Sequence, residues 1–144
     1  MPERPEQREQ APARSVTKSV AIDRPPEAVF TYLADARNWP RWAIVNVLAV
    51  EPGSEPGWWT MTTPRGTGEL RIRGQAATGL LDHDFRDPQA AWTVPARVVP
   101  NGRGAEFLMT FFQPPVLDDE EFDRQALLVD TELAALKDIL EQER

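Results

Sequence analysis

The stretch DDEEFDRQALLVDTELAALKDILE, residues 118–141, decides the fold. It begins with a run of acidic residues, and negative charge stabilises the N-terminal end of a helix through the helix dipole. Apolar residues then recur every three or four positions, namely Phe122, Ala126, Val129, Leu133, Leu136 and Leu140. This spacing predicts one helix of about 25 residues with a continuous apolar stripe. Such a stripe must be covered by another layer of the protein.

The middle of the chain predicts that layer. β-like runs, separated by turns rich in proline and glycine, span residues 44–51, 57–63, 66–74, 77–87, 90–99 and 105–113. Short connections of this kind are typical of antiparallel neighbours. An earlier run, SVTKSVAI at residues 15–22, alternates in the same way and brings the expected number of strands to seven.

Two short helices are predicted between the first and second strands. The segment PEAVFTYLAD, residues 26–35, opens with a proline that suits the first turn of a helix, and a shorter segment follows at residues 38–42. The predicted fold class is therefore α+β: a curved antiparallel sheet of seven strands wrapped around a long C-terminal helix. Only the concave face of the sheet is large enough to cover the apolar stripe.

The length of 144 residues fits a single domain. Residues 1–14, MPERPEQREQAPAR, are polar and rich in proline, so we expect a disordered tail there and one folded domain over residues 15–144. We see neither a signal peptide nor an apolar run long enough to span a membrane, which is compatible with a cytoplasmic protein.

Composition narrows the chemistry that the chain can perform. It contains no cysteine and a single histidine, so neither a metal site nor a bound cofactor is expected. The whole net charge of -7 comes from residues 118–144, which contain ten acidic residues and three basic ones, Arg124, Lys137 and Arg144. An acidic terminal segment repels nucleic acid and anionic membranes, so neither is expected as a partner.

The only histidine lies in GLLDHDF, residues 79–85. Strand alternation places His83 on the same face as Leu81 and Phe85, which is the more apolar and therefore the inner face. Asp82 and Asp84 point the other way and cannot form a relay with the imidazole. Three interpretations of His83 stay open: a hydrogen-bonded core residue, a polar anchor for a ligand oxygen, or a catalytic general acid or base.

The same alternation predicts a pocket lined by apolar side chains. The inner faces of the strands and the stripe of the terminal helix supply its candidate ligand-binding residues: Trp59, Met61, Leu81, His83, Phe85, Trp92, Phe107, Met109, Phe111, Val129 and Leu133. Proline at position 95 interrupts the run that contains Trp92.

Three stretches together resemble a known family. They are SVAIDRPPEAVFTYLADARNWPRW (residues 19–42), GLLDHDF followed by WTVPARVVPNGRGAEFLMTFF (residues 79–85 and 92–112), and the terminal segment quoted above. With the order of elements, they resemble the helix-grip fold of the START-like, or SRPBCC, superfamily over residues 16–142. The likeness is greatest to its bacterial polyketide cyclase/dehydrase-type branch.

This resemblance implies a cavity between the sheet and the terminal helix that holds a small hydrophobic or aromatic molecule. One alternative is a polyketide cyclase or dehydratase, with His83 as its acid–base group and catalysis resting largely on holding the substrate in a productive shape. Another is a protein–protein adaptor with a closed core. The sequence leaves open whether the protein acts as a monomer or a homodimer.

Overall fold

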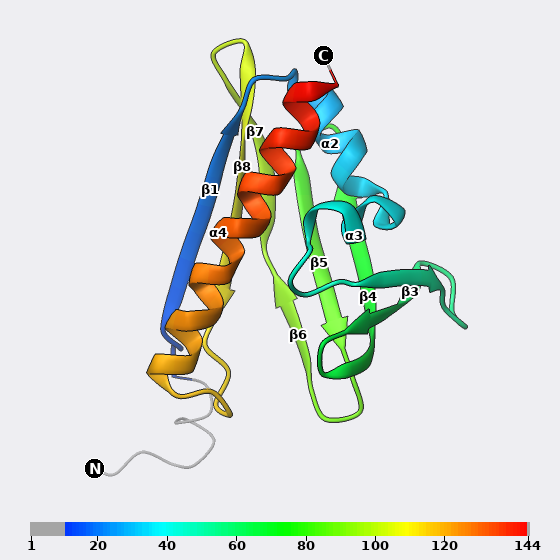
Figure 1. Cartoon of the computed structure of the whole chain (residues 1–144), viewed down its shortest axis with the longest axis vertical. Helices are drawn as coiled ribbons and strands as arrows, with labels where there is room; N and C mark the ends of the chain where they lie inside the picture. Colours follow the sequence, from blue (N-terminus) through cyan, green and yellow to red (C-terminus); the bar gives the residue numbers. More distant parts are fainter. Residues whose placement is uncertain (1–10, 144) are drawn as a thin grey trace.

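The structure is a computed structural model, and it describes residues 11–143 (Figure 1). In chain order its elements are β1 (Ser15–Ile22), α2 (Pro26–Ala34), the 3-10 helix η1 (Ala36–Asn38), α3 (Trp39–Trp42), β2 (Ala49–Pro52), β3 (Trp58–Thr63), β4 (Gly66–Gln75), β5 (Leu80–Arg86), β6 (Ala91–Val94), β7 (Ala96–Asn101), β8 (Gly104–Phe112) and α4 (Asp119–Gln142).

The strands form one antiparallel sheet in the order β1-β8-β7-β5-β4-β3-β2, and β6 pairs with β5. Helix α4 crosses in front of β1 and β8, and the short helices α2 and α3 lie beside its C-terminal half (Figure 1). The predicted α+β helix-grip architecture is therefore confirmed, including short helices between β1 and β2.

The predicted sixth strand is divided into β6 and β7, so the sheet has eight strands rather than seven. The division falls at Pro95, which has no backbone N–H group to donate to a neighbouring strand. Its carbonyl oxygen instead accepts a hydrogen bond from the Thr110 N–H group at 2.9 Å. The pairing changes at this point: β6 pairs with β5, whereas β7 pairs along its length with β8 and meets β5 only where Arg97 lies opposite Leu80.

The predicted strand at residues 44–51 is wrong over most of its length. Strand β2 begins only at Ala49, and residues 43–48 form an irregular segment between α3 and β2. Of this segment, Val47 is buried in the core, whereas Ile44 and Leu48 are about half exposed. The apolar residues that resemble a strand pattern therefore do not lie on one face of a strand: Val47 packs in the core, and Ile44 and Leu48 reach the surface.

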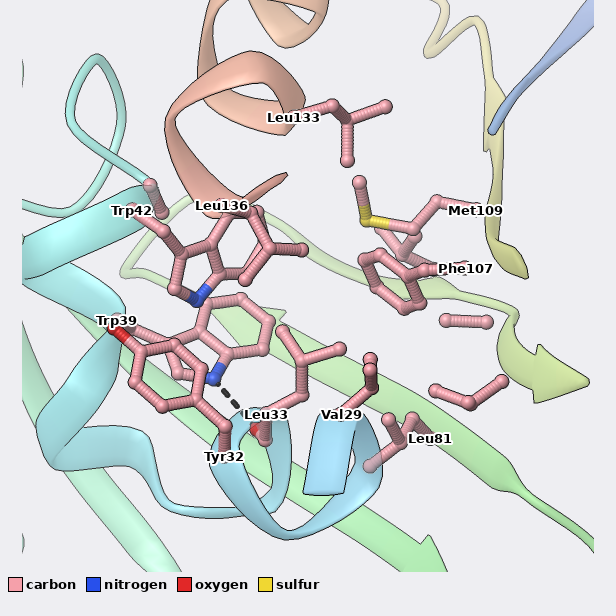
Figure 2. Packing of buried hydrophobic residues seen from close by; sticks show 14 of the residues in the cluster. Val29, Tyr32, Leu33, Trp39, Trp42, Leu81, Phe107, Met109, Leu133 and Leu136 are labelled. Atoms are coloured by element: carbon pink, nitrogen blue, oxygen red, sulfur yellow. Dashed lines mark hydrogen bonds between the residues drawn. The ribbon is translucent and has the colours of Figure 1, made fainter. Parts of the chain in front are cut away.

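Helix α4 begins with a side-chain cap. The Asp118 carboxylate accepts a hydrogen bond from the Glu121 N–H group at 2.8 Å, which satisfies one donor of the first turn. The predicted stripe is buried at Phe122, Val129, Leu133, Leu136 and Leu140. Figure 2 shows Leu133 above Met109 and Phe107 of β8, and Leu136 beside Trp42 of α3.

The predicted tail falls mostly on residues 1–10, which lie outside the described residues. Arg14, which the prediction also assigned to the tail, makes contacts with the folded domain. Its carbonyl oxygen accepts the Gln113 N–H group at 2.8 Å, and its guanidinium pairs with Asp123 and lies over the Phe122 ring. These contacts tie the start of β1 to the beginning of α4.

Truncating the stripe tests how α4 is held. We expect Leu136→Ala to lower the free energy of unfolding by roughly 2 to 5 kcal/mol, because the Leu136 side chain is fully buried and its removal leaves a cavity. The matched control is Asp138→Ala on the exposed side of the same helix, which should cost little. Urea unfolding measures both values. Equal, small losses would contradict the packing of α4 on the sheet.

Candidate functional site

The register of β5 separates the two kinds of side chain in the histidine stretch. His83 is almost fully buried on the inner face, as alternation predicts. On the outer face, an Asp82 oxygen accepts the Ala96 N–H group at 3.0 Å, and Asp84 binds Arg71 and Arg73. The imidazole and the two carboxylates therefore lie on opposite sides of the sheet.

Asp84 anchors this register from the outside. Each of the two arginines bonds to it through two nitrogens, and the Thr93 hydroxyl donates to it at 2.6 Å. Burial alone would raise the pKa of Asp84, but the hydrogen bonds from Arg73, Thr93 and Arg71 outweigh burial and lower that pKa to about 2. A one-residue slip of β5 would bury this charge in the core, so the network fixes His83 on the inside.

His83 is enclosed by aromatic rings. The Trp39 ring lies edge-on at 4.8 Å between centroids, and the Phe85 ring at 5.4 Å. The Nδ1 atom is 3.0 Å from the Leu81 carbonyl oxygen. Burial lowers the pKa of His83 to about 4, although the Leu81 hydrogen bond opposes that shift. Near pH 7 the ring is therefore neutral; Nδ1 carries the hydrogen, and Nε2 is a hydrogen-bond acceptor.

The predicted lining residues divide into two groups. Those that belong to the packed core, together with His83, are Met61, Leu81, Phe107, Met109, Val129 and Leu133. Those that reach partly toward solvent are Trp59, Phe85, Phe111 and Trp92. Trp92 is the most accessible of them, with 46% of its surface exposed. The accessible part of the predicted site is therefore aromatic.

Three of these aromatic side chains stand in one line across the sheet. Strand pairing aligns Trp59 with Leu70, Leu70 with Phe85, and Phe85 with Trp92, and we call these four residues the Trp59–Trp92 row. The Phe85 and Trp92 rings stack 5.5 Å apart at an angle of 25°. Within the row Leu70 is fully buried, Trp59 and Phe85 are partly buried, and Trp92 is exposed, so the row runs from the core to the surface.

Sequence reasoning missed the two tryptophans of α3 as site residues. The Trp39 indole N–H group donates to the Leu33 carbonyl oxygen at 2.8 Å, as the dashed line in Figure 2 shows. Trp42 packs against Trp39 and Phe107, and its buried indole nitrogen has no hydrogen-bond partner among the described residues. The three-residue spacing in Trp39-Pro40-Arg41-Trp42 was the available signal, because it places both rings on one side of a helical turn.

Two open grooves flank α4. One of about 420 Å³ lies between the start of β1 and the first turns of α4, lined by Val16, Phe122 and Leu127 among others. The second, of about 540 Å³, lies between α2 and the end of α4, where Tyr32 forms part of its floor. Neither groove is lined by His83 or by the Trp59–Trp92 row, so the predicted lining does not coincide with either of them.

Within residues 11–143, no group of three or more histidine, cysteine, aspartate or glutamate side chains is arranged to hold a metal ion. No helix in this part of the chain has the length and apolar character needed to cross a membrane.

Residues 13–141 match the family described as polyketide cyclase/dehydrase and lipid transport. No curated protein matches the sequence. Among solved structures, XoxI from Bacillus cereus superimposes with a TM-score of 0.71 at 16% identity, covering 90% of this chain and 98% of that chain.

Two further structures share the fold. The di-domain ARO/CYC protein BexL from the BE-7585A biosynthetic pathway gives a TM-score of 0.69 at 19% identity, covering 86% of this chain and 45% of that chain. The Aha1 dimer from Colwellia psychrerythraea gives 0.68 at 12% identity, covering 89% and 96%. At such identities the likeness is one of fold. The match over residues 13–141, on a sheet that grips a long C-terminal helix, shows that the chain belongs to the SRPBCC-type polyketide cyclase/dehydrase and lipid transport family.

Proposed function

We propose that the protein binds a small hydrophobic or aromatic molecule on the inner face of the sheet, beside α4, with the Trp59–Trp92 row as the contact surface. The observation that carries this proposal is the row itself, since aromatic side chains continue from the core to the surface there. Apolar surface of this kind is typical of ligand sites, and the stacked Phe85 and Trp92 rings present flat faces to a flat molecule.

His83 supplies the polar end of the site. His83 lies two residues before Phe85 on the same face of β5, and the two rings are in contact. A ligand hydroxyl that reached the Nε2 atom of His83 would donate a hydrogen bond to it. Apolar pockets use a few polar groups of this kind to orient a ligand.

The second candidate function is a cyclase or dehydratase reaction on such a ligand, favoured by the family description. In that case the folded shape of the site would do most of the catalysis. A general acid or base role for His83 stays a prediction. Its pKa of about 4 weighs against that role, because near pH 7 the neutral ring is a weak base and its one N–H group is bonded to the Leu81 carbonyl oxygen.

Aromatic stacking gives the first test of the site. We expect 2-naphthol to bind with at least micromolar affinity and Trp92→Ala to weaken that binding roughly fivefold, because one stacked ring pair is lost. Isothermal titration calorimetry measures the change. Leu127→Ala removes a comparably exposed apolar side chain from α4 and should have no effect. No binding, together with a stably associated protein in native mass spectrometry from the host, would instead favour the adaptor function.

The role of His83 is tested with a matched pair of ligands. His83→Phe should weaken 2-naphthol by about 0.5 to 1.5 kcal/mol, the usual net value of one hydrogen bond, and should leave naphthalene unchanged. Calorimetry of both ligands on both proteins measures the difference. An equal loss for the two ligands would show that the substitution only disturbs packing.

The neutral state of His83 predicts acid sensitivity. Its folded-state pKa of about 4 lies below the ordinary 6.5, so the unfolded chain binds the proton first as pH falls. Stability should therefore be lost between about pH 6.5 and pH 4, by about 3 kcal/mol in total from this group. Urea unfolding at a series of pH values should show a steeper loss for the wild-type protein than for His83→Phe. Parallel curves would mean that His83 is not buried as a neutral ring.

A further inference from the structure

Strand β1 has one long edge without a partner. It stands at the end of the sheet order, and its only partner strand among residues 11–143 is β8 (Figure 1). The strand at the other end, β2, has four residues and finishes at Pro52, whereas β1 has eight residues in unbroken register and contains no proline. Short strands and prolines are common protection against pairing with another chain, so β1 is the unprotected edge.

The pairing with β8 shows which backbone groups face this edge. The Arg14 carbonyl oxygen accepts the Gln113 N–H group at 2.8 Å, so the even-numbered residues of β1 bond to β8. Thr17 lies opposite Thr110, but the Thr110 N–H group bonds at 2.9 Å to the Pro95 carbonyl oxygen instead. The odd-numbered residues of β1 therefore turn their N–H and C=O groups away from β8.

These outward groups belong to Ser15, Thr17 and Ser19, and we call them the open edge. Within residues 11–143 they form no hydrogen bond, and the three side chains are small and exposed. The next odd-numbered residue differs, because the Ala21 carbonyl oxygen accepts the Lys137 ammonium group at 2.7 Å. The open edge thus offers hydrogen-bonding positions at three residues, and no bulky side chain blocks them.

A second copy of β1 complements this edge. In antiparallel pairing about a twofold axis at Thr17, Thr17 bonds to Thr17 of the second copy, and Ser15 bonds to Ser19 of the second copy. Every group of the open edge then has a partner. Lys18 lies opposite Val16 of the second copy, so the two lysines are kept apart.

A neighbouring register is less favourable. An axis at Lys18 would place the two Lys18 side chains directly opposite each other, and like charges in that position destabilise a sheet. It would also pair Ser15 with Ala21, whose carbonyl oxygen Lys137 already occupies. The positions of the two lysines therefore favour the axis at Thr17.

The charges beside the open edge are already neutralised. Arg14 pairs with Asp123 of α4, and Lys18 pairs with Asp130. The protein carries a net charge of -7, which opposes the approach of two copies in general. At this edge the acidic side chains of α4 have basic partners from β1 and its approach, so repulsion is smallest where the strands would meet.

Helix α4 adds an apolar contact next to the same axis. Leu127 is 65% exposed and lines the groove between β1 and α4 together with Val16 and Lys18. Pairing of two β1 strands would bring two such grooves together on one side of the joined sheet. Exposed apolar surface beside an unpaired strand is typical of an interface between chains.

We propose that the protein forms a homodimer in which two β1 strands pair in antiparallel fashion across a twofold axis at Thr17 and join the two sheets into one. The Trp59–Trp92 row lies on β3 to β6, which β7 and β8 separate from β1 in the sheet order. Dimerisation therefore leaves the proposed ligand site accessible and does not depend on it. Because the interface is small, we expect a dissociation constant in the micromolar range.

The test compares Thr17→Pro with Thr17→Ala. Proline removes the N–H group at the axis, and a strand tolerates it there because that group is not bonded to β8. Both variants lose the 2.8 Å hydrogen bond between the Thr17 and Thr110 hydroxyl groups, but alanine keeps the N–H group. Sedimentation equilibrium measures the dimer dissociation constant. We expect Thr17→Pro to raise it about tenfold or more, because each copy loses a backbone hydrogen bond, and Thr17→Ala to change it much less.

Amide hydrogen exchange followed by NMR locates the interface. In the wild-type protein the Thr17 and Ser19 amides should exchange more slowly as the protein concentration rises, because they are bonded only in the dimer. The Val16 and Lys18 amides should be protected at every concentration, since they bond to β8. If Thr17→Pro does not fold, Leu127→Asp replaces it: β1 stays intact, and two like charges meet beside the axis, so the dissociation constant should rise by a similar factor.

The outcomes separate the dimer from the binding function. A wild-type protein that stays monomeric at millimolar concentration would overturn the dimer. A dimer that Thr17→Pro leaves unchanged, with exchange at Thr17 independent of concentration, would place the interface elsewhere and overturn the pairing of β1. Slow exchange at Thr17 in a monomer would assign the open edge to another segment of the same chain. Binding of 2-naphthol should be equal in Thr17→Pro and the wild-type protein, so its absence in both would overturn the binding function and leave the dimer standing.

Discussion

The apolar stripe of α4 is the constraint on which the rest of the structure depends. Leu133, Leu136 and Leu140 are almost completely buried, and each such side chain contributes about 1.5 to 3 kcal/mol when it is removed from water. A single helix cannot bury its own stripe, so the sheet must curve around it, and Phe107 and Met109 of β8 meet it from below (Figure 2). The short helices then close the side of the core that α4 leaves open.

Because side chains alternate between the two faces of a strand, the charged groups of β4 and β5 are separated from the apolar core. The outer face of β4 and β5 carries the Asp84 network, where hydrogen bonds from Arg73, Thr93 and Arg71 outweigh burial and lower the pKa of Asp84 to about 2. The inner face one residue away carries His83, where burial lowers the pKa to about 4 and keeps the ring neutral. Neighbours in sequence thus acquire opposite electrostatic roles because the sheet lies between them.

The sequence predicted whatever depends on local periodicity. The stripe of α4, the inward direction of His83 and the helix-grip order all follow from repeats of two or about 3.6 residues. Periodicity failed at residues 44–48, which resemble a strand. Their N–H groups bond back to Ala43 and across to Glu132, a residue more than eighty positions away, and neither kind of contact leaves a repeat in the sequence. Periodicity also predicted which face of its strand Trp92 lies on, but not that Trp92 is 46% exposed. A repeat shows the direction in which a side chain points and not whether a helix covers it.

The packing around His83 limits how deep a ligand could bind in the proposed site. A molecule that only covered Trp92 and Phe85 would stay at the surface and would gain little beyond stacking. A molecule that reached the Nε2 atom of His83 would gain a hydrogen bond in a dry environment, but that space is occupied by the rings of Trp39 and Phe85. The rings around His83 therefore limit how deep a ligand can bind, and the polar contact is available only to a molecule that displaces them.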